Sequence, residues 1–276
     1  MKASFEHDFD KYLAGEELYG DDFSIEKIQE WYEAEEEGYA DKIREKGKPL
    51  DSSQYLYNKL QTKHCYNYLP KDTVLDHVLG FGSAHGYEFE PIAGMIKELS
   101  IIEPSGLFPT KTIFGIPANY VKPEVEGDLP FESGSFDLVT CFGVLHHIPN
   151  VSKVLEEMSR CLKTGGHLVI REPICSQGDW RKPRKALTLN ERGIPLNIFR
   201  DIILKLNLTT VNEQVIVFRP VVKLWQILGL GHPYTSNFGV EVDRILSDLF
   251  LWNNRYHPKS FTERFTPTAV MYVLKK

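Results

Sequence analysis

A glycine-rich stretch follows the first buried-strand candidate and has the composition of a nucleotide-binding turn. It reads VLDHVLGFGSAHG over residues 74–86, which places Asp76 at the end of the strand and Gly80 and Gly82 in the turn. Glycines allow a tight turn and let the backbone approach a ligand where a side chain would collide. Glu103, 21 residues after Gly82, ends the next strand candidate, where it would accept hydrogen bonds from ribose hydroxyls. This pattern alone suits a nicotinamide-binding fold equally well.

Titratable residues also follow two later strand candidates. His146 and His147 come after residues 136–142, and Arg171 and Glu172 close the strand candidate at residues 167–171. Catalytic groups in open parallel sheets lie at the carboxyl ends of strands, and histidine titrates near neutrality. His146, His147 and Glu172 are therefore the catalytic candidates, with the histidines removing a proton from an acceptor. The alternatives are a histidine packed against the sheet and a salt bridge or helix cap for Glu172.

Strands alternate with helices along most of the chain. Residues 73–77, 100–103, 136–142 and 167–171 are short apolar strand candidates, and residues 151–163 have helical apolar spacing between the last two. This alternation predicts an α/β fold with a mostly parallel sheet covered by helices on both faces. Residues 210–218 and 268–274 are the closing strands, with a helical insertion at 220–264 between them. Residues 24–46 and 52–69 are expected to be helices of an N-terminal cap spanning residues 1–70, and the main domain spans 71–276.

The order of several motifs resembles the class I S-adenosylmethionine-dependent methyltransferases. Residues 127–147 read GDLPFESGSFDLVTCFGVLHH, followed by IPN and then by LKTGGHLVIREP over residues 162–173. In that family the LPF and SFD elements, the LHHI turn after the fourth strand and the lead into the fifth strand recur in this order. The resemblance covers about residues 71–175 and favours a bacterial small-molecule or sugar type. It implies a Rossmann-like sheet of seven strands with an antiparallel last strand.

The resemblance also implies which residues bind the cofactor, S-adenosylmethionine, whose product is S-adenosylhomocysteine. Asp76, Gly80 and Gly82 match the first motif, with Val78 where the family has its first glycine. Glu103 matches the ribose-binding acid, and Glu124 is the nearest candidate for the acid beside the adenine. The remaining predicted cofactor contacts are the backbone after the fourth strand and a histidine of the glycine-rich turn, which are Phe142, Gly143 and His85.

A basic segment at residues 174–206 follows the fifth strand, where the family keeps the lid over its acceptor. Arginine is suited to binding carboxylates and phosphates, so this lid predicts an anionic acceptor. The alternative is a solvated loop whose charges pair with the acidic N-terminal helices. The predicted substrate-binding residues are Arg171, Arg181, Arg184 and Arg192.

Composition restricts the partners. The net charge is −6, and residues 1–50 carry 15 acidic against 7 basic residues, which argues against a nucleic-acid binder. The four cysteines form no CxxC pair and are expected to be reduced core thiols in the cytoplasm, and no metal site is predicted. No apolar run reaches the roughly 18 residues that a membrane-spanning helix needs. For the apolar stretch at 221–230, core packing or a homodimer contact is favoured over contact with a lipid-linked substrate.

We therefore expect a methyltransferase that methylates oxygen on an anionic sugar, polysaccharide or natural-product precursor. The alternatives are a protein that binds S-adenosylmethionine without transferring its methyl group, suggested by Val78, and a nicotinamide-dependent oxidoreductase. The oxidoreductase accounts for the glycines and Glu103 but leaves the LPF, LHH and KTGG elements unexplained.

Overall fold

A single mixed sheet organises the chain. The computed structural model describes residues 9–46, 55–71, 73–182, 184 and 187–276, and eight strands of these residues pair in the order β3-β4-β2-β1-β5-β6-β8-β7. The five strands from β4 to β6 run parallel, and β8 runs antiparallel between β6 and β7. The strands are β1 (Leu75–Phe81), β2 (Ile96–Ile102), β3 (Thr112–Ile113), β4 (Ile116–Val121), β5 (Phe136–Phe142), β6 (Leu162–Pro173), β7 (Thr209–Phe218) and β8 (Pro267–Lys275).

This architecture confirms the predicted Rossmann-like fold and its antiparallel last strand, but the sheet has one strand more than predicted. The extra strand, β3, pairs with β4 through a two-residue turn at Phe114 and Gly115, both of which have positive φ. Two positive φ values are typical of the type I′ turn that matches the twist of a hairpin. Nothing in the short segment TIFGIP distinguished this hairpin from a loop.

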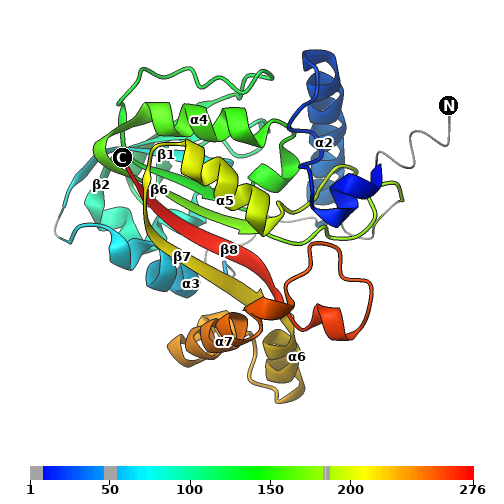
Figure 1. Ribbon diagram of the computed structural model, residues 1–276. Helices are drawn as coiled ribbons and strands as arrows, with labels where there is room; N and C mark the ends of the chain where they lie inside the picture. Colours follow the sequence, from blue (N-terminus) through cyan, green and yellow to red (C-terminus); the bar gives the residue numbers. More distant parts are fainter. Residues whose placement is uncertain (1–8, 47–54, 72, 183, 185–186) are drawn as a thin grey trace.

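Helices cover both faces of the sheet (Figure 1). On one face α4 (Val151–Cys161) and α5 (Leu196–Lys205) pack on alternate strand residues such as Leu79 and Val139. On the other face α3 (Asn58–His64) and η3 (Tyr87–Met95) pack on the intervening residues, among them Val78 and Leu138. Burial of both faces explains the continuous apolar character of the central strands. Beside α3, α7 (Asn237–Leu249) also contacts β7.

The described parts of residues 1–70 pack on opposite faces of the sheet. Leu18 belongs to the core around α4, whereas Leu60 and Tyr66 belong to the core around α3. The long helix α2 (Ile25–Lys46) stands near the end of α4 in Figure 1. Asp21 caps α4, because its carboxylate accepts the backbone N–H and the hydroxyl of Ser152 at 2.8 and 2.6 Å. The predicted division of the chain at residue 70 stays a prediction.

Most predicted elements are present, with shifted ends. The helix predicted at 24–46 is α2, and the strand predicted at 136–142 is β5. The helix predicted at 52–69 is α3 followed by the 3-10 turn η2 (Tyr66–Tyr68), and its residues 52–54 lie outside the described ones. The lid at 174–206 contains α5. The insertion at 220–264 contains α7 and α6 (Arg219–Ile227).

The structure bears on two expectations from composition, the state of the cysteines and the presence of membrane-spanning helices. All four cysteines are buried and unpaired. Among the helices of the described residues, none is long and apolar enough to cross a membrane.

Candidate active site

The first strand ends at Phe81, four residues beyond the predicted end, and this changes the register of the glycine motif. Asp76 lies near the start of β1, is 62% exposed and pairs with Lys97 at 2.7 Å. The prediction that Asp76 binds the cofactor is therefore wrong, because its side chain lies at the opposite end of the strand from the turn. Val78 is a buried strand residue, so it holds no glycine position of the turn.

The turn itself reads Gly80-x-Gly82-x-Ala84-x-Gly86. Gly82, Ala84 and Gly86 all have positive φ, at +67°, +47° and +69°. A Cβ on Gly80 would lie 2.4 Å from Ser83 Oγ, and one on Gly82 would lie 2.6 Å from Val144. Glycine is therefore required at both positions. In this register Gly80 takes the place of the family's acid.

Glu103, which directly follows β2, faces this turn, and its predicted contact with the ribose stays a prediction. Its carboxylate accepts the backbone N–H groups of Ala84 and Ser105, each at 3.1 Å. Burial raises the pKa of Glu103, and the two N–H donors oppose this rise. Tyr120 of β4 donates its hydroxyl to the carbonyl of Ala84 at 2.7 Å, which holds the other side of the turn.

Two other predicted cofactor contacts, His85 toward the methionine carboxylate and Glu124 toward the adenine, differ in setting. His85 is partly buried between aromatic rings, with its centroid 5.2 Å from Tyr87 and 4.8 Å from Phe108. Burial lowers the pKa of His85. Glu124 is exposed, three residues after β4. The cofactor roles of both residues stay predictions.

A second buried carboxyl lies under the turn and was missed by the sequence analysis. Glu88, at the start of η3, is 6% exposed, and burial raises its pKa to about 7. Its only sequence signal is a position six residues after Gly82, in a segment with no helical pattern. Glu88 is therefore an acid whose charge state changes near neutral pH.

This carboxyl predicts a pH dependence of stability. An acid whose pKa is higher in the folded than in the unfolded protein stabilises the fold at low pH, and that contribution is lost between about pH 4.5 and pH 7. Glu88→Gln removes the buried charge, so its free energy of unfolding should exceed that of wild type by on the order of 2–3 kcal/mol at about pH 8. At about pH 5 the two proteins should be equal. Urea unfolding at both pH values measures this, with the exposed Glu90→Gln as control; equal stability at pH 8 would contradict it.

The chain after β5 passes close to the glycine turn. Gly143 has φ +76°, and its backbone N–H donates to the carbonyl of Arg171 at 2.7 Å. Val144 lies against Gly82, as the close approach above shows. Phe142 and Gly143 are both partly exposed at this end of the sheet, where the resemblance places cofactor contacts.

His146 and Glu172 form a buried pair at the same edge. His146 lies in η4 (Leu145–His147), and its Nδ1 is 2.7 Å from Glu172 Oε2. Glu172 Oε1 accepts the backbone N–H groups of Val144 and Leu145 at 2.7 and 2.8 Å. Burial opposes ionisation of Glu172, but His146 and the two N–H groups outweigh it and hold the pKa of Glu172 below its ordinary value. Burial, followed by the neighbouring His147, lowers the pKa of His146.

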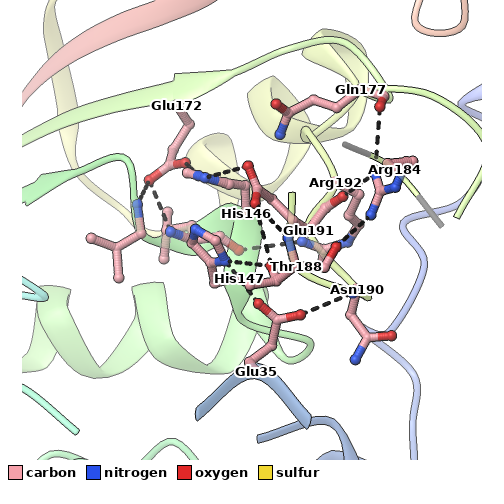
Figure 2. A network of polar contacts seen from close by, with 12 residues as sticks. Glu35, His146, His147, Glu172, Gln177, Arg184, Thr188, Asn190, Glu191 and Arg192 are labelled. Atoms are coloured by element: carbon pink, nitrogen blue, oxygen red, sulfur yellow. Dashed lines mark hydrogen bonds and ion pairs between the residues drawn. The ribbon is translucent and has the colours of Figure 1, made fainter. Parts of the chain in front are cut away.

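His147 belongs to the same polar network, shown in Figure 2. Its Nδ1 lies 2.8 Å from Glu35 Oε2 of α2 and 3.3 Å from Thr188 Oγ1. Glu191 approaches His146, with Oε1 3.7 Å from Nε2. The structure thus brings together all three predicted catalytic residues. It adds Glu35, Thr188 and Glu191, which nothing in the sequence distinguishes from their neighbours in an acidic run and a loop.

Three of the four predicted substrate arginines are directed at the protein itself. Arg192 is fully buried and donates to four backbone carbonyls, and Arg184 donates to carbonyls of its own loop. Arg181 pairs with Asp179 at 2.9 Å. These internal contacts lend no support to an anionic acceptor site at the three arginines, since a guanidinium satisfies loop carbonyls as well as it binds an anion, and that role stays a prediction. The predicted alternative was that these charges pair with the acidic N-terminal helices. The contacts above differ from that alternative as well.

Arg171 is different. Its guanidinium lies over the ring of Tyr57 at 3.8 Å, and its Nη2 is 3.2 Å from where a Cβ of Gly143 would be. Its Nη1 is buried and has no hydrogen-bond partner among the described residues. An unsatisfied buried donor is costly, so this group is suited to an anion bound beside Gly143.

Comparison with known proteins gives the class of this domain. Residues 80–170 match the family described as methyltransferase domain. A tRNA U34 carboxymethyltransferase from Nautilia profundicola is 30% identical over 109 residues, which cover 37% of this chain and 35% of that protein. A ubiquinone biosynthesis O-methyltransferase from Pectobacterium carotovorum is 35% identical over 54 residues, covering 20% of this chain and 23% of that protein. The chain thus spans about a third or less of the length of these curated relatives.

A solved structure supports the same fold. An S-adenosylmethionine-dependent methyltransferase from Mesorhizobium loti superimposes with a TM-score of 0.53 at 11% identity, over 82% of this chain and 100% of that one. Residues 80–170 thus match a methyltransferase domain, and the strand order is that of the class I methyltransferase fold, the class whose methyl donor is S-adenosylmethionine.

The donor set fits this cofactor. A buried carboxylate at the end of β2, a turn of positive φ after β1 and a glycine after β5 meet at the carboxyl edge of the sheet, where ligands bind in open α/β sheets. Glu103 would hold the ribose. The guanidinium of Arg171 borders this site, with Nη2 beside Gly143 and Nη1 without a hydrogen-bond partner among the described residues.

Proposed function

We propose that this protein is an S-adenosylmethionine-dependent methyltransferase that methylates a hydroxyl oxygen of a small molecule. The observation that carries the proposal is the 2.7 Å contact between Glu172 and His146. His146 Cε1 lies 3.7 Å from where a Cβ of Gly143 would be, so the pair adjoins the expected cofactor site. The oxygen acceptor named for the ubiquinone biosynthesis relative supports an O-methylation.

The chain's own residues position the acceptor and take its proton. S-adenosylmethionine, when bound, supplies the methyl group from its sulfonium centre. With Glu172 ionised, His146 carries its proton on Nδ1 and presents the Nε2 lone pair. Nε2 would accept the hydroxyl proton as the acceptor oxygen takes up the methyl group. Such proton removal is worth about 10²–10⁴-fold, and alignment of the reacting atoms supplies much of the remaining rate.

The acceptor class rests on fewer residues. An anionic sugar, polysaccharide or natural-product precursor stays our proposal, now supported by Arg171 alone rather than by the lid arginines. The net charge of −6 argues against a tRNA acceptor of the kind named for the Nautilia relative. We also propose that the N-terminal segment and the lid close over the acceptor, since Glu35 of α2 contacts His147. A cytoplasmic location and a homodimer stay predictions.

Release of S-adenosylhomocysteine tests the activity. Purified protein is incubated with S-adenosylmethionine and a panel of phenols, catechols and sugars, each with and without a carboxylate. Release is expected with a hydroxylated acceptor and should be abolished in the triple variant of His146, His147 and Glu172, each changed to alanine. His232→Gln in the helical insertion is the matched control. Undiminished transfer by the triple variant would overturn the site assignment, and binding of the cofactor without release on any acceptor would overturn the activity.

Cofactor affinity tests the register of the glycine motif. Glu103→Gln should weaken S-adenosylmethionine binding by about 10–100-fold, because a charge-assisted hydrogen bond contributes roughly 1.5–3 kcal/mol. Asp76→Asn should leave it within about twofold, since Asp76 lies at the far end of β1. Calorimetric titration of both variants measures this. The reverse pattern, with Asp76→Asn weakened and Glu103→Gln unchanged, would restore the register predicted from sequence.

A further inference from the structure

Two imidazoles and a carboxylate converge beneath the lid. One ring nitrogen of His146, one of His147 and one carboxylate oxygen of Glu191 all lie within 4.8 Å of one another. His146 and Glu191 are buried, and His147 is partly buried. His146 Nε2 lies 3.7 Å from Glu191 Oε1. Figure 2 shows the three side chains directed toward a common point from η4 and the loop before α5.

The surroundings prepare His146 to act as a ligand. Glu172 holds Nδ1 at 2.7 Å and is itself fixed by the N–H groups of Val144 and Leu145. A carboxylate that accepts from one ring nitrogen fixes the tautomer and orients the other nitrogen. Metal-binding histidines usually have such a carboxylate on the nitrogen that does not bind the metal. Glu35 lies against His147 in the same way, at 2.8 Å. A histidine that merely packs against the sheet requires neither carboxylate.

The charge of the cluster is negative. Three carboxylates, those of Glu35, Glu172 and Glu191, surround the two imidazoles, and the nearby guanidiniums are those of Arg184 and Arg192. Both arginines donate hydrogen bonds to backbone carbonyls. A bound divalent cation would neutralise buried carboxylates that are otherwise costly to desolvate.

We propose that His146, His147 and Glu191 bind a divalent first-row transition-metal ion such as Zn²⁺ or Fe²⁺. Two imidazoles and one carboxylate favour these ions, whereas Mg²⁺ and Ca²⁺ prefer oxygen ligands throughout. Metal–nitrogen distances of about 2.0–2.1 Å put neighbouring ligand atoms roughly 3.0–3.5 Å apart. The pair at 3.7 Å is close to this separation, and small side-chain rotations close the rest of the triangle.

The position of the cluster assigns the metal a role that rests on the proposed function. A hydroxyl bound to the ion loses its proton more readily because the ion lowers its pKa. The Nε2 lone pair of His146 then binds the ion instead of receiving the proton. The histidine pair thereby acts as a ligand set, and the released proton passes to water.

Metal binding is measured on the full chain after treatment with EDTA and dialysis. Titration with Co²⁺ followed by absorbance, and with Zn²⁺ followed by calorimetry, should show one ion per chain with a micromolar or lower Kd. His147→Gln and Glu191→Gln should each weaken binding by at least tenfold, and His232→Gln should not change it. Thermal melting establishes that each variant is folded. Absence of binding by the folded wild type at millimolar metal, or unchanged binding in both ligand variants, overturns the proposal.

Activity separates this proposal from the proposed function. EDTA-treated protein should release S-adenosylhomocysteine at least tenfold more slowly, with recovery on adding Zn²⁺ or Fe²⁺. Transfer that is insensitive to EDTA in protein without bound metal overturns the metal role and leaves the methyltransferase. Metal binding without transfer on any acceptor supports the site and counts against the methyltransferase.

Discussion

Glu172→Gln is expected to slow methyl transfer by about 10²–10⁴-fold while leaving S-adenosylmethionine affinity within about threefold. The glutamine oxygen can still accept the N–H groups of Val144 and Leu145, so the backbone at the end of β5 keeps its support. The glutamine amide, however, would donate to His146 Nδ1 where the carboxylate accepts from it. This reverses the tautomer and puts a proton on Nε2. Nε2 can then neither accept a proton nor bind a metal ion.

Steady-state kinetics and calorimetry on the same preparation test this prediction. A fall in kcat with unchanged cofactor affinity is the expected signature, because a merely structural role would disturb both quantities. Glu213→Gln, which breaks an ion pair between the edge strand β7 and Arg200 of α5, is the control. Full activity of a folded Glu172→Gln protein would show that the Glu172–His146 pair has no part in the reaction.

Arg192→Met should lower the free energy of unfolding by about 3–5 kcal/mol. The guanidinium is fully buried and donates to the carbonyls of Tyr19, Leu145, Ile148 and Pro149 at 2.8–3.3 Å. Methionine fills a similar volume but leaves these buried acceptors without a donor, at roughly 1–3 kcal/mol each before relaxation. It also removes a positive charge close to Glu172. Arg192 connects the N-terminal segment and the lid to η4. Both segments should therefore become less ordered in the variant.

Urea unfolding measures this loss. Arg200→Met is the matched control, because its ion pair with Glu213 is partly exposed and should contribute less than about 1 kcal/mol. Hydrogen exchange should show loosened protection at residues 145–149 in Arg192→Met and normal protection in the control. If Arg192→Met lost no more stability than the control, Arg192 would be free for a role in binding, as the sequence analysis expected.

The fold was largely predictable because its signals are local. The apolar run of β5 and the helical spacing of α4 lie in short windows, and the motifs around them occur in a recognisable order. The hairpin at Phe114 was missed because a bulky residue rarely takes a positive φ, so sequence favours glycine or asparagine there.

The glycine motif shows why register is harder to predict than fold. The family's pattern is Asp-x-Gly-x-Gly-x-Gly. Asp76-x-Val78-x-Gly80-x-Gly82 departs from it at one position, Val78, and Gly80-x-Gly82-x-Ala84-x-Gly86 departs at two, Gly80 and Ala84. Only the end of β1 at Phe81 decides between them, and strand ends depend on pairing with β2 and β5. Ala84 has φ +47°, and an alanine in a sequence does not indicate a left-handed conformation, so the register that the structure adopts is hard to recognise.

The site was predictable in its residue types but not in its contacts. His146, His147 and Glu172 were selected because they follow strands, and the structure places them together. The contacts of the lid arginines could not be predicted, because a sequence shows a guanidinium's charge but not the carbonyls that satisfy it. Glu35 stands in the run EAEEEG, where nothing marks one carboxylate as the partner of a histidine 112 residues away.

Calorimetric titration of the purified protein with S-adenosylmethionine, and separately with NAD, tests the central claim most directly. The turn after β1, Glu103 and the backbone after β5 predict binding of one S-adenosylmethionine per chain and no measurable heat with NAD. Binding of NAD with no affinity for S-adenosylmethionine would contradict the account.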